Sequence, residues 1–323
     1  WKIRIKRKGI YMEREERVFP SSSGMCNIHT VIWYPDNSIY NYPVGVIQIA
    51  HGMIDHIERF EEMAEFFAGK GFVVGHGDSV NGEEDYGYFA KGSHGADYLI
   101  KDMHRLTRIM KKMYRDIPYI LIGHSMGSFM ARKYACIYGD ELDGVIFLGT
   151  GNQPKSVVNA GLKLAHMAKL VHGDRYRSRL INKLMFGTYN KRIKDNRTDS
   201  DWLTKDTGIV DKYTSDPKCS YMFTTNGYIG FLNVIRFDIN EKNIARTPAA
   251  LPVLFASGED DPVGDYGKAV KKVFKLYTKY VDNVELRLYE DDRHELHSET
   301  NRQEVFEDLL EWIESDVLAY DID

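Results

Sequence analysis

The chain has 323 residues, of which 43% are hydrophobic and 28% are charged, and its formal net charge is -4. This composition is ordinary for a soluble globular protein and argues against a nucleic-acid-binding protein, which would carry a basic excess. No apolar run is long enough to span a bilayer, and the basic start, WKIRIKRKGI, is not followed by the apolar stretch of a signal peptide. The length suits one large α/β domain that carries an insertion.

Cysteine usage bears on the redox compartment. Cys26, Cys136 and Cys219 are widely spaced, odd in number and free of any CxxC pair. A disulfide framework in a small secreted domain has an even number of cysteines at characteristic spacings. We therefore expect three reduced, buried thiols in a cytoplasmic protein.

Strand-like segments alternate with helix-like segments along most of the chain. Residues 44–50, VGVIQIA, form an unbroken apolar run that is typical of a strand buried on both faces, and a helical pattern that ends at Gly71 follows. Further strands are predicted at 14–20, 28–34, 71–77, 119–122, 144–151, 251–258 and 283–289, and further helices at 94–114, after residue 125, at 266–280 and from about 301. About eight strands alternating with helices predict a mostly parallel, doubly wound sheet of the α/β class.

The sequence pattern changes between residues 152 and 245. This stretch lacks the strand–helix alternation and is rich in basic, aromatic and apolar residues. Within it, residues 155–172 have a helical pattern, and residues 221–237 are dense in aromatic side chains. The alternation resumes at residue 251. We therefore predict a core of residues 1–151 and 246–323, interrupted late in its sheet by an insertion at 152–245.

The segment GHSMG, residues 123–127, is a candidate site for a nucleophile. The pattern G-x-S-x-G is weak evidence alone, but here a strand precedes it and a helix follows it, as a nucleophile elbow requires. Glycines on either side of Ser125 allow a strained turn in which larger side chains would clash with the strand and the helix. The turn also places Ser125 at a helix N-terminus, where the dipole favours developing negative charge.

A serine hydroxyl is a weak nucleophile, so Ser125 needs a general base, and the base needs an orienting partner. In a fold of this type the chain order is serine, then an acid, then histidine. Asp261 follows the strand at 251–258 and His294 follows the strand at 283–289, so both lie where open α/β sheets place their sites. We predict that His294 accepts the proton of Ser125 and that Asp261 holds the imidazole.

Neighbouring residues offer alternatives for both partners. Glu259 and Asp260 adjoin Asp261 in an acidic turn, and His297 follows His294 closely. We favour Asp261 because it comes just after a strand, and His294 because it lies nearer the strand end, between an arginine and a glutamate. The segment HELH departs from the HExxH spacing that puts two imidazoles on one helix face, so we expect no metal and no cofactor.

Acyl transfer at such a triad needs backbone N–H donors for the developing oxyanion. Met126, directly after the nucleophile, supplies one amide. The loop after the strand at 44–50 supplies the other, because it reads AHGM and Met53 is the predicted donor. His51 and Gly52 are expected to shape this loop, and His51 is not expected to transfer protons.

Four segments together resemble the monoacylglycerol lipase and lysophospholipase branch of the α/β-hydrolases. They are AHGMIDH with the following ERF, GHSMGS, SGEDDPVG and RHE, and the resemblance extends from about residue 14 to residue 316. It implies the α/β-hydrolase fold with a cap formed by the insertion, Ser125, Asp261 and His294 as the catalytic triad, and the amides of Met53 and Met126 as the oxyanion hole. It also implies hydrolysis of carboxylic esters, namely monoacylglycerols or lysophospholipids, through an acyl-enzyme.

The inserted segment bears on the choice of substrate. Its apolar and aromatic residues together predict a chamber over Ser125 that suits an acyl chain better than a peptide, although each single residue is more simply explained by core packing. A mobile cap with exposed apolar surface could also touch a membrane or micelle. Small soluble esters or amides are an alternative substrate class. A non-catalytic binding protein is a third interpretation, which the complete triad disfavours.

Overall fold

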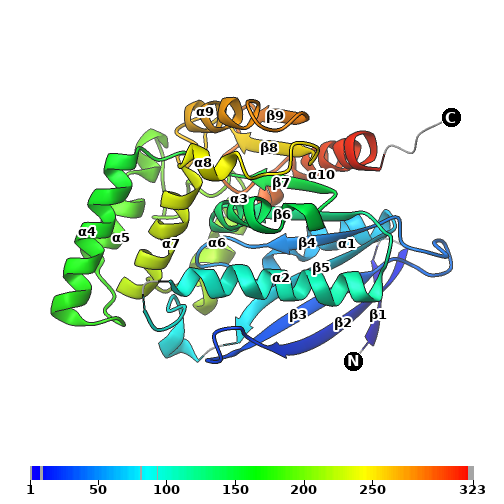
Figure 1. Ribbon diagram of the computed structural model, residues 1–323, viewed down its shortest axis with the longest axis horizontal. Coiled ribbons are helices and arrows are strands. Elements are labelled where there is room, and N and C mark those ends of the chain that lie inside the picture. Colours follow the sequence, from blue (N-terminus) through cyan, green and yellow to red (C-terminus); the bar gives the residue numbers. More distant parts are fainter. Residues whose placement is uncertain (1, 8–9, 81, 93, 319–323) are drawn as a thin grey trace.

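The computed structural model describes residues 2–7, 10–80, 82–92 and 94–318 (Figure 1). A central sheet crosses the molecule with helices on both faces, and a further group of helices lies to one side, at the left in Figure 1. One core lies between the sheet and helices α1 (Glu61–Gly69) and α10 (Arg302–Trp312). The other lies between the sheet and helices α2 (Gly95–Met113), α3 (Met126–Tyr138) and α9 (Lys268–Tyr277).

The described residues form a sheet of nine strands in the order β1-β2-β3-β5-β4-β6-β7-β8-β9. Neighbouring strands from β5 to β9 run parallel, whereas β1, β2, β3 and β5 pair antiparallel. The strands are β1 (Lys2–Arg7), β2 (Ile10–Pro20), β3 (Asn27–Tyr34), β4 (Gly45–Ala50), β5 (Phe72–Val80), β6 (Tyr119–His124), β7 (Gly144–Leu148), β8 (Val253–Gly258) and β9 (Val284–Tyr289). The mostly parallel, doubly wound sheet predicted from the sequence is confirmed.

Strand β1 is absent from the sequence-based prediction, which contained eight strands. It pairs with β2 at the edge of the sheet, in a register that joins Lys2 to Glu15 and Arg7 to Ile10. Its sequence, KIRIKR, has no apolar run. An edge strand has only one paired side, so it can form without the apolar run from which buried strands are predicted.

The central strands β4, β6, β7 and β8 are buried along their whole length. Helices cover both faces of this part of the sheet, which explains the unbroken apolar runs in the sequence. Strand β6 ends at His124, and helix α3 begins at Met126. The turn between them holds Ser125 at the carboxyl edge of the sheet, and the loops after β4, β8 and β9 leave from the same edge.

The chain between β7 and β8 is helical, as its sequence pattern indicates. It contains α4 (Lys155–His172), α5 (Arg179–Phe186), α6 (Thr207–Ser215), α7 (Thr225–Asp238) and α8 (Glu241–Ile244). Helix α7 packs against α2, α3 and α4 and is buried over most of its length. Helix α4 is more open, and its residues Leu170 and Val171 are 87% and 73% exposed. Among the described residues, no helix combines the length and the apolar character needed to cross a membrane.

All three cysteines are free thiols, as expected. Cys136 and Cys219 are buried, but the prediction of burial is wrong for Cys26, which is only half-buried. The reason is its position, since Cys26 comes directly before β3 and borders a cavity.

Candidate active site

The backbone at Ser125 is strained in the way that the flanking glycines suggested. Ser125 has φ 53° and ψ -121°, a region that residues with a side chain rarely adopt. A Cβ atom added to Gly127 would overlap the carbonyl oxygens of Ala50 and His51, and one added to Gly123 would overlap the Gly127 carbonyl. Both positions therefore need glycine because strand β4 and helix α3 approach the turn so closely.

The structure brings Asp261 and His294 together. Asp261 Oδ1 lies 3.0 Å from His294 Nδ1, and both side chains are buried. The carboxylate is held from two further sides, since Oδ1 accepts the Val263 N–H at 2.8 Å and Oδ2 accepts the Ser257 hydroxyl at 3.3 Å. Its rivals Glu259 and Asp260 are exposed. Asp261 is therefore the acid of this turn that can orient the imidazole.

The imidazole of His294 lies beside the elbow. The Ser125 N–H donates to the Leu148 carbonyl at 3.0 Å. The residue after Leu148, Gly149, has φ 57° and lies against the His294 ring, where an added Cβ would come within 3.1 Å of ring atoms. His124, just before the nucleophile, hydrogen-bonds through Nε2 to the His294 carbonyl at 3.3 Å. Within the described part of the chain, Nε2 of His294 has no hydrogen-bond partner, which leaves it available to act as a base.

The alternative base, His297, faces another part of the site. Its ring stacks on Phe60, with 4.1 Å between the ring centroids, and lies 4.7 Å from the ring of His124. Burial lowers the pKa of His297 to about 4, so its imidazole is neutral at physiological pH. The contact with Asp261 belongs to His294, so the geometry favours His294 as the base.

The loop after β4 approaches the serine closely. A Cβ atom on Gly52 would lie 3.1 Å from the Cβ of Ser125 and 3.3 Å from Nδ1 of His124, so a larger residue would crowd the nucleophile. Met53 follows Gly52 and borders the same cavity as Ser125. Met126 directly follows Ser125, and Met53 follows the glycine that approaches it, so the two amides stay the predicted oxyanion donors.

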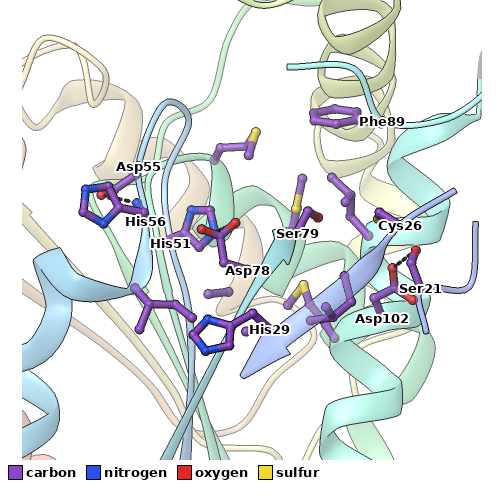
Figure 2. A pocket seen from close by; sticks show the side chains of 18 of the residues that line it. Ser21, Cys26, His29, His51, Asp55, His56, Asp78, Ser79, Phe89 and Asp102 are labelled. Atoms are coloured by element: carbon purple, nitrogen blue, oxygen red, sulfur yellow. Dashed lines mark hydrogen bonds and ion pairs between the residues drawn. The ribbon is translucent and has the colours of Figure 1, made fainter. Parts of the chain in front are cut away.

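His51 braces this loop. Its Nδ1 lies 2.9 Å from the Gly52 carbonyl, and its Nε2 lies 3.4 Å from Asp78 Oδ1. Figure 2 shows the His51 ring and the Asp78 carboxylate facing each other. Burial lowers the pKa of His51, but the attraction of Asp78 outweighs it and raises the pKa to about 9. The charged imidazole therefore contacts both the Gly52 carbonyl and the Asp78 carboxylate, and its role in shaping the loop stays a prediction.

A buried ionic network lies beneath the loop and was only partly visible in the sequence. Arg59 donates to Asp55 Oδ1 at 2.9 Å and to Glu295 Oε1 at 2.8 Å, and its guanidinium stacks on Tyr213 at 4.7 Å. Arg59, Asp55 and Glu295 lie in segments that carry the family resemblance, but their pairing was not predicted, and Tyr213 lies outside these segments. The network joins the loop after β4 to the segment after β9 and to helix α6.

Two cavities flank the elbow. The first, of about 430 Å³, is bordered by Ser125 and Met53 and otherwise by mainly apolar side chains from α4, α5 and α7, with Trp202 beside His294. The second, of about 560 Å³, lies among β3, β5 and α2 and shares the loop after β4 as a wall (Figure 2). Its polar lining includes Asp55, His56 and Asp78. The predicted apolar chamber beside Ser125 corresponds to the first cavity.

The chain resembles known proteins over most of its length. Residues 41–301 match the model of a family described as serine aminopeptidase, S33. The chain is 25% identical to the monoacylglycerol lipase of Mycolicibacterium smegmatis over 94% of this chain and 98% of that protein. It is also 25% identical to human monoglyceride lipase, over 87% of this chain and 84% of that protein.

Solved structures of an esterase and a lipase also match most of the chain. A thermostable carboxyl esterase from Bacillus coagulans in complex with glycerol has a TM-score of 0.86 and 27% identity, and the match covers 94% of this chain and 99% of that chain. A soluble variant of the monoglyceride lipase of Saccharomyces cerevisiae, solved with a substrate analogue, has a TM-score of 0.73 and 20% identity over 94% and 95% of the two chains. The second likeness concerns the fold alone.

Proposed function

Because the chain belongs to the serine aminopeptidase S33 family of the α/β-hydrolase superfamily, we propose that it cleaves carboxylic esters through an acyl-enzyme formed on Ser125. The observation that carries the proposal is the buried pair of Asp261 and His294, 3.0 Å apart, beside a strained serine at the carboxyl edge of the sheet. A serine with an oriented imidazole is equipped for acyl transfer.

The reaction follows from these groups. His294 Nε2 takes the proton of Ser125 as Oγ attacks the ester carbonyl, and the oxyanion that forms binds the amides of Met53 and Met126. Asp261 stabilises the imidazolium. Collapse of the tetrahedral intermediate breaks the ester C–O bond, and His294 returns the proton to the leaving alcohol. Water activated by His294 then cleaves the acyl-serine and releases the fatty acid and the free enzyme.

We propose monoacylglycerols or lysophospholipids as substrates. The apolar cavity of about 430 Å³ that reaches Ser125 suits an acyl chain, which gains free energy by leaving water. Relatives named monoacylglycerol lipase and monoglyceride lipase support the same class. A hydroxyl-bearing leaving group would meet the polar side chains of Asp55, His56 and Asp78 in the neighbouring cavity.

We further propose that residues 152–245 act as a cap over a core of residues 1–151 and 246–323. Helices α4 and α5 of this segment carry exposed apolar residues next to basic ones, including Leu170 and Val171 near Lys169. Such a surface suits transient contact with a micelle or membrane that holds the substrate. A cytoplasmic location stays a prediction, which depends on the free thiols.

A fluorophosphonate probe tests the nucleophile, and a graded ester panel tests the substrate. Labelling of folded protein at Ser125, lost in Ser125→Ala, is the expected result, and unlabelled protein would contradict the hydrolase proposal.

In a panel of esters graded by acyl length and head group, the protein should hydrolyse medium or long monoacyl esters fastest. Because the family is described as serine aminopeptidases, aminoacyl amides belong in the panel, and faster cleavage of amides would favour the amidase alternative.

A further inference from the structure

Three potential metal ligands meet where the helical segment between β7 and β8 touches the loop after β4. A ring nitrogen of His56, a carboxylate oxygen of Asp216 and the thiol sulfur of Cys219 all lie within 4.8 Å of one another. His56 lies in the loop, three residues after Met53. Asp216 directly precedes a short 3-10 turn after α6, η5 (Pro217–Cys219), and Cys219 is the last residue of that turn. Imidazole, carboxylate and thiolate are the groups that bind zinc in proteins.

Two of the three ligands are already oriented by partners on their other polar atoms. His56 Nε2 faces Asp216 Oδ2 at 2.9 Å, while Nδ1 lies 2.6 Å from Glu58 Oε2. Asp216 Oδ1 accepts the Lys218 N–H at 2.8 Å, which leaves Oδ2 pointing at His56. A metal-bound histidine almost always donates its second N–H to a carboxylate or carbonyl, as His56 can here to Glu58.

The spacing of the ligands suits a tetrahedral ion. Zinc bonds of about 2.0–2.3 Å to nitrogen, oxygen and sulfur separate the ligand atoms by about 3.3–3.7 Å. His56 Nε2 and Asp216 Oδ2 are 2.9 Å apart, somewhat closer than this, and all three ligand atoms lie within 4.8 Å of one another. The Asp216 side chain is 31% exposed, which provides an entry path and a place for water as the fourth ligand.

We propose that His56, Asp216 and Cys219 form a binding site for Zn²⁺ that joins η5 to the loop after β4. The thiol and the imidazole favour zinc over Mg²⁺ or Ca²⁺, which prefer sites made of oxygen ligands. A bound ion cross-links two segments that are otherwise joined by hydrogen bonds and ion pairs. It thereby holds the helical segment against the loop that carries Gly52 and Met53.

A second cluster in the same region is less suited to a cation. Ligand atoms of Asp55, His124 and His297 also lie within 4.8 Å of one another. Asp55, however, is paired with the Arg59 guanidinium at 2.9 Å, and this fixed positive charge repels a metal ion. Two cations act on the first cluster, and carboxylates offset both. Lys218 has its ammonium group 3.1 Å from Glu58, and Arg59, whose charge also acts on Cys219, is paired with Asp55 and Glu295.

Metal binding to tag-free, chelator-treated full-length protein tests the site. Calorimetric titration should show one Zn²⁺ per chain, and Co²⁺ should give the near-ultraviolet charge-transfer band of a thiolate–cobalt bond. Cys219→Ser should remove that band and weaken zinc binding by more than about tenfold, while Glu58→Gln should weaken it about 10- to 100-fold. Cys26→Ser is the matched control, since Cys26 lies outside the cluster, and it should leave both signals unchanged.

Thermal unfolding shows whether each variant is folded. Zinc should raise the Tm of the parent and of Cys26→Ser but not that of Cys219→Ser, because a ligand stabilises only a native state that binds it. The proposal is overturned if Co²⁺ gives no thiolate band in the parent, or if folded Cys219→Ser binds zinc as tightly as the parent. These readouts measure binding, so they are independent of whether the chain hydrolyses esters.

Discussion

Replacing Asp261 with asparagine isolates the charge of the orienting acid from its shape. The asparagine oxygen can still accept the Val263 N–H that Asp261 Oδ1 accepts at 2.8 Å, and the amide group can donate to the Ser257 hydroxyl. The side chain is fully buried, so no solvent replaces the lost charge. The change therefore removes the negative charge next to His294 while it keeps the packing.

The size of the effect follows from the distance between the two groups. A carboxylate and an imidazolium 3.0 Å apart attract each other by about 5.5 kcal/mol at an effective dielectric constant of about 20. This attraction arises only when His294 carries the proton, that is, in the transition state. At about 1.4 kcal/mol for each factor of ten, its loss lowers kcat by about 10⁴-fold, with little change in KM.

The assay is steady-state hydrolysis of a short, soluble p-nitrophenyl ester by purified protein, together with thermal unfolding to verify the fold. Asp260→Asn is the matched control, because Asp260 is the exposed neighbour of Asp261 and should keep nearly full activity. A folded Asp261→Asn variant that retains more than about a tenth of the parental kcat would refute the reasoning. A large loss in Asp260→Asn would refute the choice of acid.

Three further predictions concern the base, the micelle surface and the loop. His294→Ala should abolish turnover without unfolding the chain. His297→Ala should lower kcat less than about tenfold, because the His297 ring stacks on Phe60 away from Asp261. The reverse result would make His297 the base. Leu170→Asp should lower activity on micellar monoacylglycerol several-fold and leave that on a soluble ester unchanged, and equal losses on both would contradict a surface role. Since Asp78 raises the pKa of His51 from 6.5 to about 9, their pairing stabilises the fold fully below pH 6.5 and is lost as the pH rises through 9. Urea unfolding across this range should show a smaller fall in stability for Asp78→Asn than for the parent, and equal falls would count against the pairing.

Sequence reasoning worked best where one physical cause governs a local pattern. Strands β4, β6, β7 and β8 are buried on both faces, so their apolar runs marked them directly. The edge strand β1 lacked such a run and was missed. The roles of Ser125, Asp261 and His294 stay predictions, although the folded chain brings the acid and the base within 3.0 Å.

The fold class, the strained turn at Ser125 and the chain order of its candidate partners could be predicted from the sequence, because strand–turn–helix patterns and glycine requirements are local. Which of the neighbouring acids faces the imidazole depended on the folded chain, since Asp261 points inward while Asp260 is exposed. It also brought His56 to Asp216 and Cys219, which are far apart in the sequence. Contacts of this kind depend on how the helical segment folds back onto the sheet, and no local pattern encodes that path.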